Sequence, residues 1–146
     1  MIRILRMMVA LLIIQKNYYP QGSQTKRGIA QLYSLVENVG MRASFNYIVS
    51  IRIEGHILFV SASYSPSNFT DRSFTAKIVV THNHKEKSYS LTRSAQGDIV
   101  QLGYKLLGNC TINIPETGNV DIKLNVVFEY DSGIGYSNGR AEIPVL

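Results

Sequence analysis

Short runs of β-branched and aromatic residues, separated by turn-forming residues, recur from Phe45 almost to the end of the chain. Short strands at regular intervals, with turns between them, are typical of a β-sandwich or a small β-barrel. No stretch of this region repeats apolar residues at helical spacing over the length of a helix. With 146 residues the chain is long enough for one domain with a buried core. The sequence therefore predicts an all-β domain.

Strand alternation is clearest after Asp121, where Ile122, Leu124 and Val126 share one face of a predicted strand. Residues 57–62 are apolar on both faces, which predicts a central or covered strand. Sandwich and jelly-roll topologies share these local patterns, so the order of the strands stays open. The predicted strands are Phe45–Ile53, His56–Tyr64, Ser73–His82, Lys85–Arg93, Ile99–Leu107, Thr111–Ile114, Val120–Tyr130 and Arg140–Val145.

The first 28 residues differ from the rest of the chain in composition. Met1–Ile14 combines two arginines with an apolar run that is too short to span a bilayer. It suits a secretory signal, an organellar presequence or an apolar arm that packs on the domain, and these alternatives remain open. Asn17–Gly28 is typical of an exposed linker. We therefore expect residues 1–28 to form an arm and linker, and residues 29–146 to form the β-sandwich domain.

A short helix is predicted over Ile29–Val36, directly before the sheet. The apolar residues at positions 29, 32, 33, 35 and 36 are close to helical spacing, and Asn38 and Gly40 follow as residues that can end a helix. The predicted architecture is thus an all-β sandwich preceded by a short helical or apolar N-terminal segment.

The net charge of +5 comes entirely from the N-terminal region. Residues 1–30 contain five basic and no acidic residues, whereas the remaining residues contain ten of each. A domain without a basic bias lacks the field that steers a polyanion to its surface. Nucleic acid is therefore not expected as a partner, and the short apolar run argues against insertion into a membrane.

Few residues suggest chemistry. Cys110 is the only cysteine, which excludes an intrachain disulfide and a cysteine-based zinc site, and we expect it to be a small buried residue. His82-Asn83-His84 is more typical of a hairpin turn than of a metal site. Nucleophile elbows, phosphate loops and dinucleotide fingerprints are missing from the sequence. The prediction is a protein that is not an enzyme and that needs no metal or cofactor.

The most distinctive stretch of sequence is Glu129–Gly139, which combines tyrosines with glycines between two predicted strands. Loop tyrosines offer a stacking face and a hydroxyl at low entropic cost, which suits the recognition of sugars or proteins. The alternative is a structural loop whose rings cap the sheet. The candidate ligand-binding residues are Tyr64, Tyr130, Asp131, Tyr136 and Asn138.

Three stretches resemble the fungal immunomodulatory proteins. Val127–Gly135 is similar to the family's strand that runs into a Tyr-x-x-Gly-x-Gly segment, and Ile57–Pro66 is similar to its junction from an apolar strand to Tyr-x-Pro. Lys87-Ser88-Tyr89-Ser90 is a third, shorter match. The resemblance implies an immunoglobulin-like or fibronectin-III-like sandwich without enzymatic activity. It also implies a dimer formed through an N-terminal element, here Phe45–Ile53, and binding to cell-surface glycans.

The leading functional prediction is a secreted, non-enzymatic binding protein of lectin-like or immunomodulatory type. Its expected partners are a glycan or a cell-surface protein and further copies of itself, as a homodimer. The alternative is a structural or assembly subunit, such as a coat or pilus-like component, that uses exposed sheet edges and the N-terminal arm. A third and weaker interpretation is a membrane-active β-protein whose arm lies in the membrane interface.

Overall fold

A computed structural model describes residues 16–34, 43–93, 100–131, 133 and 135–146 of the chain. These residues form strands and no helix, so the predicted all-β class is confirmed. No helix long and apolar enough to cross a membrane occurs in this part of the chain. The strands are β1 (Gly22–Gln31), β2 (Tyr33–Ser34), β3 (Ser44–Glu54), β4 (Ile57–Pro66), β5 (Thr70–His82), β6 (Lys85–Ser90), β7 (Lys105–Asn113), β8 (Val120–Asp131) and β9 (Tyr136–Pro144).

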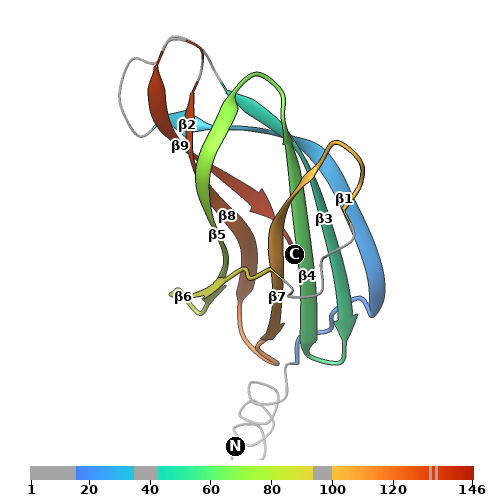
Figure 1. The fold of residues 1–146 in the computed structure, drawn as a ribbon. Helices are drawn as coiled ribbons and strands as arrows, with labels where there is room; N and C mark the ends of the chain where they lie inside the picture. The colour runs from blue at the N-terminus through green and yellow to red at the C-terminus, as the bar shows by residue number, and fades with distance from the viewer. Residues whose placement is uncertain (1–15, 35–42, 94–99, 132, 134) are drawn as a thin grey trace, which may run out of the picture.

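The strands form two antiparallel sheets that lie face to face as a β-sandwich (Figure 1). Sheet A has the order β1-β3-β4-β7, and sheet B has the order β2-β9-β8-β5-β6. The chain passes from sheet A to sheet B between β1 and β2, and it does so again in the β4–β5 and β7–β8 connections. Because β4 pairs with β7 and β5 pairs with β8, the last two crossings interlock the sheets.

Aromatic rings fill one end of the core between the sheets. The Phe128 ring on sheet B lies 5.3 Å from the Phe45 ring and 4.9 Å from the Tyr64 ring, both on sheet A. Phe69, in the connection between the sheets, packs against Phe128 and Tyr130 at 5.5 and 5.2 Å. Aromatic pairs at such distances contribute about 0.5–1.5 kcal/mol each beyond the burial of their area.

The predicted helix over Ile29–Val36 is wrong for the residues that the structure describes. Gly22–Gln31 is strand β1, paired with β3 along its whole length, and Tyr33–Ser34 pairs with β9. Backbone pairing to a preformed strand overrides a weak local helical pattern. Ile29 is an outward-facing residue of this strand and is 71% exposed, so it does not belong to a buried helical face. Residues 35 and 36 lie outside the described part of the chain.

Residues 17–28 were expected to be an exposed linker, and this too is corrected. Residues 22–28 belong to β1, and the preceding residues are tied to the loop before β8. The backbone N–H of Asn17 donates to the Glu116 carbonyl at 2.6 Å, and the Tyr19 hydroxyl donates to the Pro115 carbonyl at 2.8 Å. The sandwich therefore begins at Gly22 and not at residue 29.

Strand β7 joins parts of the two strands predicted over Ile99–Leu107 and Thr111–Ile114. The first prediction is wrong for residues 100–104, which are not in a strand, and residue 99 lies outside the described part of the chain. Strand β7 continues through Gly108 because a β-bulge there lets Leu107 stand as an extra residue opposite β4. Gly108 has a φ of +141°, which glycine adopts without strain. The glycine marks a bulge inside a strand and not a break between strands.

The turn at His82-Asn83-His84 is confirmed. Asn83 and His84 connect β5 to β6 as a two-residue hairpin and have φ angles of 48° and 68°. Positive φ at both central residues is the pattern of a type I′ turn, which matches the twist of the flanking strands. The two imidazoles do not converge on one point: the His82 Nε2 lies 2.8 Å from the Thr117 carbonyl, and His84 is exposed.

Candidate functional site

The structure divides the five candidate ligand-binding residues between the core and the surface. Tyr64 and Tyr130 are each 1% exposed and belong to the aromatic core. Neither ring presents a face to solvent, so the expectation that these two tyrosines form a recognition surface is corrected. Alternation explains the burial, since both residues occupy inward-facing positions of central strands.

Asp131, Tyr136 and Asn138 lie together at the β8–β9 hairpin. Asp131 pairs with Tyr136, and Asn138 pairs with Glu129. The Tyr136 ring is 63% exposed, and the Arg72 guanidinium lies over it at 4.1 Å. The Asp131 carboxylate accepts a hydrogen bond of 2.8 Å from the Gly133 backbone. The structure therefore brings together three of the five candidate residues. Their one aromatic ring, that of Tyr136, already has the Arg72 guanidinium over it.

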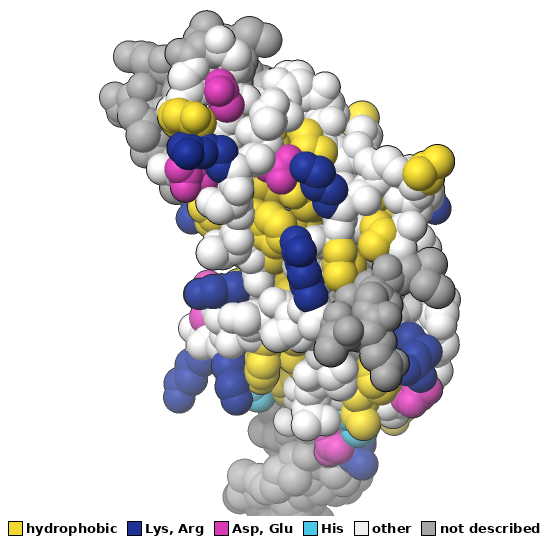
Figure 2. Space-filling view, in the orientation of Figure 1, with side chains coloured by type: hydrophobic (Ala, Val, Ile, Leu, Met, Phe, Trp, Pro, Cys, Tyr) yellow, Lys and Arg dark blue, Asp and Glu magenta, His cyan; other side chains and the backbone are white. Residues whose placement is uncertain are grey.

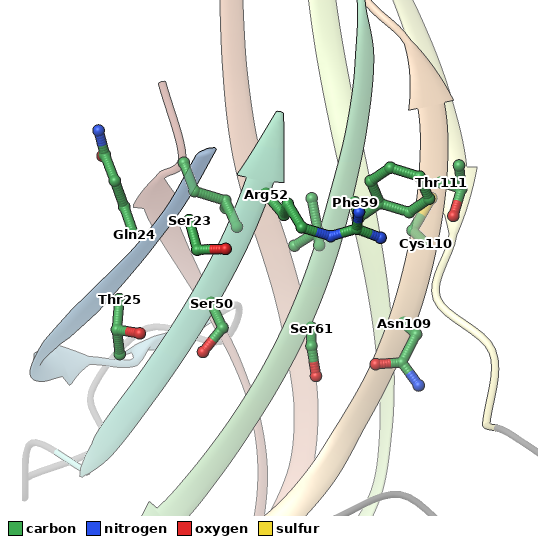
Figure 3. Close-up of a pocket in the computed structure, with 12 residues that line it drawn as sticks. Ser23, Gln24, Thr25, Ser50, Arg52, Phe59, Ser61, Asn109, Cys110 and Thr111 are labelled. Atoms are coloured by element: carbon green, nitrogen blue, oxygen red, sulfur yellow. The ribbon is translucent and has the colours of Figure 1, made fainter. Parts of the chain in front are cut away.

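A second surface, which the sequence did not reveal, lies on the outer face of sheet A. Thr25 pairs with Ser50, Ser50 with Ser61, and Ser61 with Asn109, so one row of polar side chains runs across all the strands of the sheet (Figure 3). We call this row the hydroxyl ladder. Neighbouring strands lie about 4.8 Å apart, so the ladder extends about 14 Å.

The ladder faces outward because the intervening residues are buried. Val49 and Ile51 flank Ser50 in β3 and point into the core. Val60 and Ala62 do the same on either side of Ser61 in β4. Successive side chains of a strand point to opposite faces, so Ser50 and Ser61 must face solvent. The hydrophobic core thus fixes the orientation of the ladder.

The adjacent row combines an aromatic ring with a guanidinium. Ser23, Arg52, Phe59 and Thr111 are paired in register across the same strands. The Arg52 guanidinium lies 4.0 Å from the centre of the Phe59 ring (Figure 3). It also forms an ion pair with Glu54. Because two partners hold Arg52, its remaining N–H donors have a defined direction beside the ladder.

Together the two rows line a shallow groove of about 370 Å³, at the low end of the range for small-molecule sites. The hydroxyls of Thr25, Ser50 and Ser61 have no hydrogen-bond partner among the described residues. Each hydroxyl can donate one hydrogen bond and accept two. The groove therefore offers an ordered set of polar groups to a ligand.

Cys110 lies at the edge of this groove but is not an activated thiol. Its side chain packs against the core but is half-buried and not fully buried as expected. Burial raises the pKa of the Cys110 thiol above its usual value. The thiol form therefore dominates at neutral pH, and the residue serves packing.

Charge is dispersed over the face of the molecule that Figure 2 shows. Figure 2 shows Lys and Arg side chains in several separate places on the face in view, with Asp and Glu among them. Within the described ranges, no three His, Cys, Asp or Glu side chains are grouped closely enough to hold a metal ion. Among the residues that line the groove on sheet A, Arg52 alone is charged, and its ion pair with Glu54 balances that charge, so the groove is suited to hydrogen bonding with an uncharged polar ligand.

The hydroxyl ladder could not be recognised from the sequence because its members come from four separate strands. Ser50 and Ser61 stand in apolar runs where alternation alone gives them no special role. Only the register between strands places them in one row. The only local indication of the ladder in the sequence is that Ser50 and Ser61 are small polar residues within strands that are otherwise strongly apolar.

Comparison with models of known protein families, with curated proteins and with solved structures finds no significant match to this chain.

Proposed function

We propose that this protein is a non-enzymatic, lectin-like protein that binds saccharides in the groove on sheet A. The observation that carries the proposal is the hydroxyl ladder, in which Thr25, Ser50, Ser61 and Asn109 stand in register across the sheet. A sugar presents hydroxyls at regular intervals along its length, and each hydroxyl both donates and accepts. Serine, threonine and asparagine side chains have the same dual capacity.

Phe59 and Arg52 add to the match with a saccharide. The Arg52 guanidinium lies over the half-buried Phe59 ring, and the apolar surface that the ring has left next to the ladder suits the C–H face of a sugar ring. The Arg52 guanidinium offers fixed donors to sugar oxygens. A groove of this kind combines polar groups that orient a ligand with a small apolar contact.

The groove is shallow, so one site binds weakly, with an expected Kd of about 1 mM, which corresponds to about −4 kcal/mol. Linking two such sites raises the overall affinity by orders of magnitude without any new contact. The proposal therefore includes a homodimer that acts outside the cell, as the resemblance to fungal immunomodulatory proteins implies. It also includes their immunoglobulin-like or fibronectin-III-like type of sandwich.

A glycan array probed with the full chain tests this proposal. Neutral saccharides that bind are then titrated against a variant with Ser50→Ala and Ser61→Ala. The variant should bind about 5- to 150-fold more weakly, because it loses two hydrogen-bonding side chains of about 0.5–1.5 kcal/mol each. Thr75→Ala is the matched control, since Thr75 is an exposed residue on the outer face of sheet B. If the ladder variant and the control bind the saccharide equally well, the hydroxyl ladder is not the binding site.

One observation favours the assembly subunit as a second candidate. Strand β1 forms an edge of sheet A, and among the described residues its backbone pairs only with β3. The strand is ten residues long and contains no proline, so it can accept a strand from another molecule. In contrast, the edge strand β6 is shorter and carries charges that discourage pairing. Concentration-dependent polymers seen by light scattering, without saccharide binding, would support this candidate.

A further inference from the structure

The outer face of sheet B carries a compact group of charged side chains around Asn125. Lys77 from β5, Lys123 from β8 and Arg140 from β9 lie there with Glu86 and Glu142. Asn125 pairs with Lys77 on one side and with Glu142 on the other, so it stands at the centre of the group. The pocket is on the sheet opposite the hydroxyl ladder and shares no residue with it.

The cations in this pocket differ in whether they form ion pairs. Lys123 is shared between Asp121 and Glu142, with N–O distances of 3.7 and 3.9 Å. Lys77 and Arg140 form no ion pair with any described residue. With Asp121 counted as a partner of Lys123, the three cations of the group meet three carboxylates, and Lys77 and Arg140 are the two cations without an ion pair. A ligand with a single carboxylate can bind between these two cations, whereas a polyanion is repelled by Glu86 and Glu142.

Asn125 supplies an independent sign of a missing partner. Its Oδ1 atom is buried and accepts no hydrogen bond from any described residue. A buried acceptor without a donor costs free energy, and such atoms in folded proteins are nearly always satisfied. The Asn125 side chain therefore lacks a donor in the unliganded protein, and the side chain must rotate before a ligand hydroxyl can reach Oδ1.

We propose that this pocket binds a hydroxylated monocarboxylate of the hexuronic acid type, an acidic sugar, between Lys77 and Arg140 and over Asn125. The sugar carboxylate accepts hydrogen bonds from the ammonium of Lys77 and the guanidinium of Arg140. One sugar hydroxyl donates to Asn125 Oδ1, and others donate to the carboxylates of Glu86 and Glu142. This site is independent of the saccharide groove on sheet A and adds a preference for acidic sugars.

Titration of the full chain with glucuronate at low salt, followed by NMR, tests the inference. Wild-type protein should bind saturably and shift the side-chain amide resonance of Asn125, while glucose should leave that resonance in place. Lys77→Gln and Arg140→Gln should each weaken binding about tenfold, as expected for the loss of one charge-assisted hydrogen bond. Lys85→Gln is the matched control, because Lys85 is an exposed lysine outside the pocket.

Three outcomes overturn the inference: no saturable glucuronate binding, equal binding by the two pocket variants and the control, or displacement of glucuronate by an equal concentration of inorganic phosphate. The variant with Ser50→Ala and Ser61→Ala should bind glucuronate as wild type does. That result separates this site from the ladder, so either site can fail without the other.

Discussion

The hydroxyl of Tyr64 in β4 donates a hydrogen bond of 2.6 Å to Oδ2 of Asp71 in β5. This contact joins sheet A to sheet B near the point where the chain crosses between them. Lys105, which pairs with Tyr64 on sheet A, donates to the other carboxylate oxygen of Asp71 at 2.8 Å. The Asp71 carboxylate thus links the two sheets by accepting hydrogen bonds from two residues of sheet A, Tyr64 and Lys105.

The Asp71 network makes stability depend on pH at the acid end. Burial favours the neutral carboxyl of Asp71, but hydrogen bonds from Lys105 and Tyr64 and the Lys105 charge outweigh it and hold the pKa below its usual 3.8. A lowered folded-state pKa stabilises the protein above the unfolded-state pKa, and this contribution is lost as the pH falls through the folded-state pKa.

The measurement is urea unfolding of wild type and Asp71→Asn across a pH series. The free energy of unfolding should differ between them by about 1–3 kcal/mol at neutral pH, because the variant loses a charge-assisted acceptor. The difference should shrink as the pH falls below 3.8. A difference that stays constant down to strongly acid pH would show that Asp71 contributes through its shape and not through its charge.

The two partners of Asp71 should contribute unequally. Tyr64→Phe removes a donor in a buried setting and should destabilise the fold by about 1–2 kcal/mol. Lys105 is 58% exposed, so Lys105→Gln should cost less than about 1 kcal/mol. A double-mutant cycle by urea unfolding measures the coupling between them. Equal losses in the free energy of unfolding from Tyr64→Phe and Lys105→Gln would contradict the larger contribution expected from Tyr64.

Gly108 should tolerate a side chain far less well than Gly133, although both have positive φ angles of 141° and 93°. A Cβ on Gly108 lies 2.8 Å from Leu91 Cβ and 3.0 Å from the Thr92 carbonyl oxygen, whereas a Cβ on Gly133 meets open space. We expect Gly108→Ala to cost about 3 kcal/mol and Gly133→Ala about 1 kcal/mol, measured by thermal unfolding. Similar losses of stability in the two variants would indicate that the positive φ angle, and not the contacts of the added Cβ, determines the cost of both substitutions.

Tyr130 and Tyr136 should respond differently to truncation. Tyr130 is part of the aromatic core, so Tyr130→Ala should destabilise the fold by about 3–5 kcal/mol. Tyr136 is mostly exposed, so Tyr136→Ala should change stability by less than about 1 kcal/mol, the loss of one exposed cation–π contact. Circular dichroism melting curves distinguish them, and a large loss for Tyr136→Ala would mean that its ring caps the sheet.

Much of the sandwich follows from local sequence. In β8, the alternation of Ile122, Leu124 and Val126 with polar residues predicts the buried face, and all three are fully buried. The turn at Asn83 was also predictable, because asparagine tolerates a positive φ. These features depend on neighbours in the chain, which a single sequence displays.

Features that depend on distant pairing were not predictable. Strand β1 pairs with β3, some twenty residues away, and this pairing overrides the helical spacing around Ile29. Tyr64 and Tyr130 carry polar hydroxyls that suggest a surface, yet their rings lie in the core. The hydroxyl ladder exists only through the register of four strands, and no local pattern specifies register across a sheet.

The most direct test of saccharide binding on sheet A is a map of backbone amide shifts during titration with the strongest neutral saccharide from the array. The account predicts that the largest shifts centre on Ser50, Ser61 and Asn109 and decline toward sheet B. Shifts centred on Tyr136 and Asn138 at the β8–β9 hairpin, or none that saturate, would contradict it.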